Sequence, residues 1–366
     1  MTPTYSRLIC CLLALVSSVQ MSWAQSQLDS LIPVRGLCIS APKSPDVERF
    51  LRFIDEELGP KHINTLVLRF GYNYAYESFP ELRDSLPLTR DQVKQIADLC
   101  KSYEINLIPM INLLGHQSWA EKTGRLLTHF PQFDETPHIT MPGKYTWPNA
   151  EGLYCKSYCP NHPDVHGVVF ALVDELMEAC DATTFHAGMD EVFYLAMDSC
   201  SRCSGLDPAT LFAQEVNAIN NHLAANGYNL WIWGDRLLDG KTTGIGLWEA
   251  SMNNTARAID LIAKEVVICD WHYKKAYPTP VLFAMKGLAV VACPWNQPEV
   301  MEEQFKNHFI YRKNASETLK SRYLGVMQTV WAGAGPFMDS YYTAGLNELG
   351  DSRSLKKFMG LLDMLK

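Results

Sequence analysis

This sequence lacks long apolar runs, clusters of basic residues and a glycine-rich phosphate loop. Beyond the first 24 residues, no apolar segment approaches the roughly 20 residues that a membrane-spanning helix needs. The formal net charge is −8, which argues against nucleic acid or an anionic membrane surface as the main partner. With 366 residues, 47% of them hydrophobic, the chain is long enough for one large core.

The first 24 residues have the pattern of a secretory signal peptide. Arg7 forms a short basic region, residues 8–19 are mostly apolar, and residues 22–24 offer a small-x-small cleavage site. The apolar run is short for an uncleaved membrane anchor. A lipoprotein is disfavoured because Ile9 stands where a small residue is expected. We therefore expect residues 1–24 to be a signal peptide and the protein to be exported, to the periplasm or the extracellular space.

The chain has 11 cysteines, and two of them lie within the expected signal peptide. Four of the others form two short-spaced pairs, Cys155-x-x-x-Cys159 and Cys200-x-x-Cys203. In an oxidising compartment, disulfides are the default interpretation of such pairs. A four-thiolate zinc site is the alternative that the spacing permits. In either case we expect the four thiols to lie near one another, in a structural role.

Eight short apolar runs recur along the chain, each rich in Val, Ile, Leu or aromatic residues, as strands buried on both faces are. The runs are 34–39, 65–70, 106–112, 184–190, 229–235, 266–272, 289–296 and 324–332. Amphipathic segments between them predict helices at 91–103, 165–180, 208–226 and 255–264.

This alternation predicts parallel strands joined by crossover helices. Eight repeats fit a (β/α)8 TIM barrel that forms a single domain over residues 25–366. The alternative is a doubly wound open sheet, but no glycine-rich loop follows the first run. Residues 240–251 are interpreted as an extra hairpin or loop between the fifth and sixth strands.

A barrel requires functional groups to gather where its strands end. Polar and aromatic residues do follow the third to eighth runs. In chain order they are Asn112, His116, Asp190, Glu191, Trp233, Asp235, Asp270, Tyr273, Trp295 and Trp331. Tryptophans mixed with polar groups favour a sugar site, because indole faces cover the apolar C–H faces of a pyranose.

The fourth run ends in two adjacent acids, Asp190 and Glu191. Adjacent carboxylates repel, and in a dry cleft one of them is driven toward its protonated form. A protonated acid beside an ionised one is what cleavage of a glycosidic bond requires. The period of a strand places His186, Gly188 and Asp190 on one face. Glu191 joins Asp190 only if the strand has ended and the backbone turns there.

The pattern His-x-Gly-x-Asp-Glu, from His186 to Glu191, resembles the signature of glycoside hydrolase family 20, the β-N-acetylhexosaminidases. Arg35-Gly36 and the segment ending in Gly115-His116 are similar to further family segments. The resemblance implies an exo-glycosidase that removes terminal β-linked N-acetylhexosamine (GlcNAc or GalNAc) from carbohydrate, without a cofactor or catalytic metal. It also implies a substrate-assisted retaining mechanism, in which Glu191 is acid and then base and Asp190 holds the acetamido N–H.

The resemblance implies contacts to the sugar as well. Arg35 would hold hydroxyls of the terminal sugar, although a salt bridge closing the bottom of the barrel is the alternative for this residue. The other expected substrate contacts are His116, His186, Trp233, Asp235, Asp270, Tyr273, Trp295 and Trp331. For the two histidines, a structural role in the barrel interior is the alternative.

The sequence departs from the family pattern at three places. Met110 and Asn112 stand where the family often has acidic residues. Ile268 replaces a tyrosine that usually binds the acetamido group, with Tyr273 as a possible substitute. The segment 331–333 lacks the glutamate of the family's Trp-x-Glu. These departures leave two alternatives open, a glycosidase with a different sugar specificity and a catalytically silent glycan-binding barrel.

Overall fold

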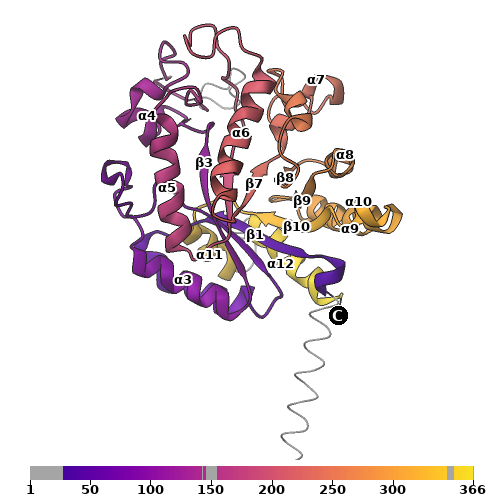
Figure 1. Ribbon diagram of the computed structural model, residues 1–366. Coiled ribbons are helices and arrows are strands. Elements are labelled where there is room, and N and C mark those ends of the chain that lie inside the picture. Colours follow the sequence, from indigo (N-terminus) through magenta and orange to yellow (C-terminus); the bar gives the residue numbers. More distant parts are fainter. Residues whose placement is uncertain (1–27, 142, 146–154, 344–349, 366) are drawn as a thin grey trace, which may run out of the picture.

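The structure is a computed structural model that describes residues 28–141, 143–145, 155–343 and 350–365 (Figure 1). The expected signal peptide, residues 1–24, lies outside the described residues. Within the described ranges, no helix combines the length and the apolar character that crossing a membrane takes.

Eight parallel strands close into a barrel, and helices surround it (Figure 1). Around the barrel the strands are β1 (Val34–Ser40), β10 (Tyr323–Thr329), β9 (Ala289–Cys293), β8 (Val267–Trp271), β7 (Asn229–Trp233), β6 (Thr184–Gly188), β3 (Asn106–Leu113) and β2 (Thr65–Arg69). Each strand coincides with one of the eight apolar runs. The (β/α)8 prediction is confirmed, and the open sheet is wrong.

Three of the predicted helices are present as α3 (Arg90–Ser102), α5 (Val165–Ala179) and α6 (Pro208–Ala224). Two of them begin at a capping side chain: Thr89 forms a capping box with Gln92, and Asp207 accepts the N–H of Thr210. The helix predicted at 255–264 is wrong, because only a 3-10 turn forms there, Ala256–Asp260.

The remaining described helices complete the outer layer. They are α2 (Val47–Phe53), α4 (Arg125–His129), α7 (Gly240–Thr243), α8 (Thr279–Met285), α9 (Pro298–Asn314), α10 (Glu317–Lys320), α11 (Ala334–Tyr342) and α12 (Gly350–Asp363). The segment 240–251 is a loop that contains α7 and is closed by a bridge between Asp239 and Ser251.

Strand periodicity decides which side chains fill the barrel. On β7, Trp231 and Trp233 point inward while Leu230 and Ile232 pack against the helices. The inward set is mostly apolar, with His186 packed on Trp233, and it includes Met110, where the resembled family often has an acidic residue. The barrel is therefore a packed core, and tryptophans form its layer beneath the ends of the strands.

Candidate active site

The acid pair lies just past the end of β6, on a turn with unusual backbone geometry. Gly188 and Met189 have φ angles of 68° and 67°, and Glu191 has a φ of 50°. Left-handed φ angles are rare outside glycine and concentrate at functional sites. The strand has ended at Gly188, so the backbone turns and Glu191 reaches the side of Asp190, as the sequence required.

His116 joins the two carboxylates. It follows β3, and its Nε2 lies 3.1 Å from Asp190 Oδ2 and 3.4 Å from Glu191 Oε2. Cys155 Sγ completes the group, 3.6 Å from His116 Nδ1 and 3.4 Å from Glu191 Oε2. The side chains of Asp190 and Glu191 are only 7% and 13% exposed, so their charges interact in a dry environment.

The environment drives the pKa values of the two acids in opposite directions. Burial raises the pKa of Glu191 to about 7, and the negative charge of Asp190 acts in the same direction, against the opposing charge of His116. Burial alone would also raise the pKa of Asp190, but the charge and hydrogen bond of His116 hold it below its ordinary value. Near neutral pH, an ionised Asp190 therefore stands beside a Glu191 that carries its proton in about half of the molecules.

One oxygen of Asp190 is left for a ligand. Oδ2 faces His116, whereas Oδ1 is buried and has no hydrogen-bond partner among the residues that the structure describes. A buried carboxylate oxygen without a donor is costly. A substrate N–H donor placed there would satisfy it.

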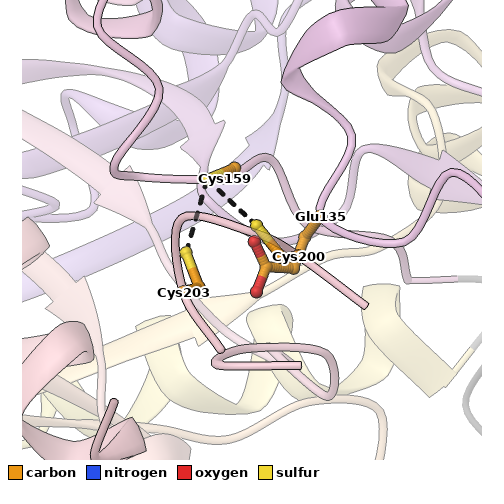
Figure 2. A group of neighbouring side chains, drawn as sticks. All are labelled: Glu135, Cys159, Cys200 and Cys203. Carbon is orange, nitrogen blue, oxygen red and sulfur yellow. Dashed lines mark hydrogen bonds between the residues drawn. The ribbon is translucent and has the colours of Figure 1, made fainter. Parts of the chain in front are cut away.

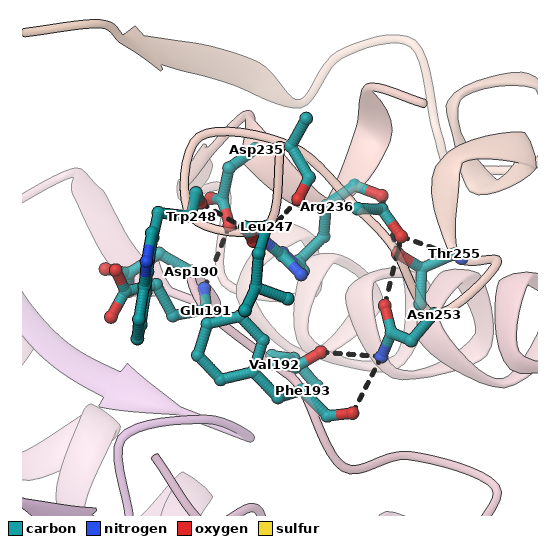
Figure 3. A network of polar contacts seen from close by, with 12 residues as sticks. Asp190, Glu191, Val192, Phe193, Asp235, Arg236, Leu247, Trp248, Asn253 and Thr255 are labelled. Carbon is teal, nitrogen blue, oxygen red and sulfur yellow. Dashed lines mark hydrogen bonds and ion pairs between the residues drawn. The ribbon is translucent and has the colours of Figure 1, made fainter. Parts of the chain in front are cut away.

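Asp235 holds the backbone of Glu191 (Figure 3). Its Oδ2 accepts the N–H of Glu191 at 2.9 Å and Nε of Arg236 at 2.6 Å, and its Oδ1 accepts Trp271 Nε1 at 3.1 Å. Arg236 Nη2 in turn donates to three backbone carbonyls, those of Leu247, Trp248 and Ala250. Because protein donors occupy both oxygens, Asp235 is a positioning residue and not the sugar contact that the sequence predicted.

The residues after Glu191 are held by the same loop. Asn253 Nδ2 donates to the carbonyls of Val192 and Phe193 at 2.9 and 3.0 Å (Figure 3). The Phe193 ring packs edge-on against Trp248 and beneath the guanidinium of Arg236. The loop between β7 and β8 thus fixes the turn that carries the acid pair.

Aromatic side chains surround the ends of the neighbouring strands. Trp233 and Trp331 have ring centroids 5.8 Å apart, and Trp331 Nε1 donates to the hydroxyl of Tyr273 at 2.8 Å. Trp295 packs against the ring of Tyr273. The guanidinium of Arg69 lies 4.1 Å from the centre of the Trp331 ring. The four predicted aromatic residues thus form one connected group, and Arg69 joins it.

His186 belongs to the barrel interior. It is fully buried, its Nδ1 accepts the N–H of Gly188 at 3.0 Å, and its ring packs on Trp233. It supports the turn from below, which favours the structural alternative over a direct contact with substrate.

Two predicted sugar contacts require correction. Arg35 lies at the opposite end of the barrel, where it donates to the carbonyls of His62 and Ile32 and pairs with Asp29 at 2.9 Å. The salt-bridge alternative is the correct one, since its position early in β1 is far from the strand ends. Asp270 alternates with inward-facing Cys269 and Trp271 on β8, so it points to the outer layer.

In that layer Asp270 Oδ2 accepts the hydroxyl of Thr279 at 2.6 Å, and its Oδ1 lies 3.2 Å from His272 Nε2. Ile268 shares this outward face. The substitution at Ile268 therefore leaves the lining of the barrel interior unchanged.

The structure also shows functional candidates that the sequence did not single out. Asp351, from α12, is buried, and this burial raises the pKa of its carboxyl group. Hydrogen bonds with the side chain of Trp295 and with the backbone of Ala332 and Trp331, and the positive charge of Arg69, act against that rise. It brings a carboxylate to the end of β10, where the local sequence has none. No motif near residue 331 could have revealed this, because the residue comes from a later helix.

The hairpin of β4 (Ser118–Trp119) and β5 (Lys122–Thr123) adds an exposed aromatic residue beside the acid pair. The indole of Trp119 is stacked over His116 with centroids 6.0 Å apart, and the residue is 60% exposed. A large exposed aromatic side chain at the rim of a site is a surface for binding a ligand.

The four paired cysteines do not lie together. Cys155 belongs to the acid pair, whereas Cys159, Cys200 and Cys203 form a separate buried cluster with Glu135. The expectation of one four-cysteine group is therefore wrong, and Glu135 takes the place given to Cys155. Among the residues that the structure describes, this second cluster is the group of possible metal donors that lies outside the acid pair.

Gly188 is the residue on which this turn depends. A Cβ built there would lie 1.5 Å from Asn112 Oδ1, and φ is +68°. We expect Gly188→Ala to lower the free energy of unfolding by about 2–4 kcal/mol, from strain and overpacking together. Gly227→Ala is the matched control, because φ there is +76° but no described atom lies within 4 Å of the added Cβ, so only about 1 kcal/mol should be lost. Urea denaturation measures both, and equal losses would contradict the packing argument.

Comparison with known proteins agrees with this geometry. Residues 73–335 match the model of the glycosyl hydrolase family 20 catalytic domain. A curated relative, Hexosaminidase D of Bos taurus, is 25% identical over 184 residues, which are 48% of this chain and 48% of that protein. The chain thus spans about half the length of the curated relative that it matches.

Solved structures share the fold. A chitobiase of Flavobacterium johnsoniae superposes with a TM-score of 0.60 at 17% identity, over 91% of this chain and 51% of that one. A β-N-acetylhexosaminidase from Bacteroides fragilis gives a TM-score of 0.60 at 13% identity, over 89% of this chain and 66% of that one. At these identities the likeness shows the barrel alone.

Proposed function

We propose, from the premise that this chain belongs to glycosyl hydrolase family 20, that it is an exported exo-acting β-N-acetylhexosaminidase. Its substrates are glycans that end in β-linked N-acetylglucosamine or N-acetylgalactosamine. The mechanism is substrate-assisted and retaining, so that the nucleophile is the acetamido oxygen of the sugar itself.

The state of the acid pair carries this proposal. Glu191, with its pKa raised to about 7, is a proton donor at neutral pH, and Asp190 is an anion with one unpartnered buried oxygen in the described part of the chain. In a two-carboxylate retaining mechanism, a carboxylate of the protein would attack C1 directly. Asp190 is instead bound to His116, which suits a counter-charge better than a nucleophile.

The steps follow from these positions. The acetamido oxygen attacks C1 while Glu191 protonates the departing glycosidic oxygen. Asp190 Oδ1 accepts the acetamido N–H and stabilises the positive oxazolinium ring that forms. Glu191, now ionised, takes a proton from water as that water attacks C1 on the face from which the glycosidic oxygen departed, opposite the acetamido oxygen. Two inversions at C1 give net retention.

The aromatic group supplies the binding surface. Trp331 and Tyr273 offer apolar faces for the terminal sugar, and Asp351 stands near them as an acceptor for its hydroxyls. Trp119 lies on the other side of His116 and is exposed, as a platform for the leaving-group part of the substrate. The barrel interior beneath Trp233 is packed, so the site is closed from below.

A glycosidase with a different sugar specificity is the second candidate. It is motivated by the segment 331–333, where Ala332 and Gly333 follow the tryptophan without a glutamate. The intact, oppositely shifted acid pair argues against a catalytically silent barrel.

The substrate prediction is tested with a panel of aryl β-glycosides. We expect hydrolysis of the 2-acetamido gluco or galacto compounds, and a rate lower by at least ~10²-fold on matched compounds with a 2-hydroxyl, because the nucleophile is then missing. From a long polymer, single sugars should be released from the ends. Equal rates with and without the acetamido group, or release of internal oligosaccharides, would contradict the proposal.

A further inference from the structure

A second chemically distinctive group lies apart from the acid pair. Cys159, Cys200, Cys203 and Glu135 are all buried, and one donor atom from each lies within 4.8 Å of the others (Figure 2). Cys159 Sγ is 3.3 Å from Cys203 Sγ and 3.5 Å from Cys200 Sγ. In a tetrahedral zinc site, ligand atoms at about 2.3 Å from the metal lie about 3.8 Å from one another. The four donor atoms of this cluster are therefore separated by about the distances that a zinc site requires.

The buried carboxylate of Glu135 is the feature that most favours a bound cation. The residue is fully buried; its Oε1 accepts the N–H of Met197 at 3.2 Å, the thiol of Cys200 interacts with the carboxylate, and Oε2 has no other hydrogen-bond partner in the described ranges. The basic side chain of Lys156, which lies beside this segment, is engaged by Asp134 and the carbonyl of Thr136. A buried carboxylate without a positive partner is costly.

A disulfide would not remove this cost. One bond among three thiols leaves a third thiol over and brings no positive charge to Glu135. A divalent cation satisfies all four donors at once. Thiolate sulfurs with one carboxylate oxygen, in four-coordinate arrangement, select zinc among the common divalent metals.

We propose that Glu135, Cys159, Cys200 and Cys203 form a structural zinc site. The three thiols lose their protons when the metal binds. The fourth ligand is a carboxylate from a different segment, which is why the spacing of the cysteines alone did not identify the set.

The site ties together three segments around the acid pair. Glu135 follows the short helices after β3, Cys159 precedes α5, and Cys200 and Cys203 lie between the acid pair and α6. The loop that leaves Glu191 is thereby anchored nine residues further on, at Cys200. The metal supports the geometry of the catalytic turn and takes no part in the chemistry.

Metal content of the purified full chain tests the proposal. We expect one zinc per chain by plasma mass spectrometry, released when a mercurial reagent titrates the thiols and detected with a chromogenic chelator. Cobalt in place of zinc should give the intense absorption of thiolate-to-cobalt charge transfer. None of these readouts depends on glycosidase activity, so the zinc site and the proposed function can fail separately.

Variants locate the site. Cys203→Ser should lose the zinc, whereas Cys100→Ser, which alters a buried cysteine of α3 outside the cluster, should keep it. If Cys203→Ser does not fold, Glu135→Gln retains all three thiols and should release zinc to EDTA at least tenfold faster than the unaltered chain. Metal-free protein with a disulfide from Cys159 to Cys200 or Cys203, zinc that survives Cys203→Ser, or unchanged release from Glu135→Gln would each overturn the proposal.

Discussion

Replacing Glu191 with glutamine is expected to lower the rate on 2-acetamido glycosides with poor leaving groups by ~10²–10⁴-fold, because the departing oxygen then receives no proton. Aryl glycosides with a strongly activated leaving group need little protonation and should lose far less at the bond-breaking step. Steady-state kinetics of Glu191→Gln on a graded series of aryl leaving groups measures this difference as a steeper dependence on leaving-group acidity.

The pH profile checks the same assignment. Burial raises the pKa of Glu191 to about 7, so the group donates its proton below that pH and loses it as the pH rises through 7. The unaltered enzyme should show a fall in kcat/KM above about pH 7, and Glu191→Gln should lack that limb because glutamine does not ionise. An alkaline limb that persists near pH 7 in the variant, or uniform loss across all leaving groups, would assign the acid to another residue.

The barrel was predictable because its signal is repeated. Each buried strand carries a short apolar run, and eight such runs separated by crossover segments permit few other folds. The helix prediction failed where helix propensity was weak, because residues 255–264 form only a 3-10 turn, Ala256–Asp260. α9 and α12 were not predicted, and α12 proved to carry Asp351.

The acid pair was predictable for a different reason. A dense local motif, His186 to Glu191, concentrates strand, turn and catalytic groups within six residues. His116 and the tryptophans followed from the rule that barrel sites gather at strand ends. Arg35 was misassigned because a motif match does not report which end of a strand a side chain occupies; its early position in β1 places it with Asp29.

Contacts between segments that are distant in the chain could not be predicted from the sequence. Glu135 and Cys200 are 65 residues apart in the chain, and nothing near Glu135 resembles a metal motif. The orientation of Asp270 could not be predicted either, because a shift of one residue along a strand decides whether a side chain faces the barrel interior or the helices. The pairing of Cys155 with Glu191 likewise arises only when the loop after β3 folds over the turn.

Replacing Asp190 tests the identity of the nucleophile. Asp190→Asn keeps an acceptor for the acetamido N–H but removes the charge that faces the oxazolinium, so we expect kcat to fall by ~10²–10³-fold on 2-acetamido substrates. Asp190→Ala removes both, and should lose binding of the acetamido group as well. A thiazoline mimic of the cyclic intermediate should inhibit the unaltered enzyme and bind Asp190→Asn less tightly.

The covalent state of quenched enzyme decides between the two kinds of mechanism. If the acetamido oxygen is the nucleophile, no sugar becomes attached to the protein at any point, because the intermediate closes on the substrate itself. Mass spectrometry of enzyme quenched during turnover should therefore find an unmodified chain. A glycosyl ester on Asp190 or Glu191 would identify a protein nucleophile. If the ester were on Asp190, its Oδ1, which is unpartnered in the described structure, would be the attacking atom instead of the acetamido acceptor.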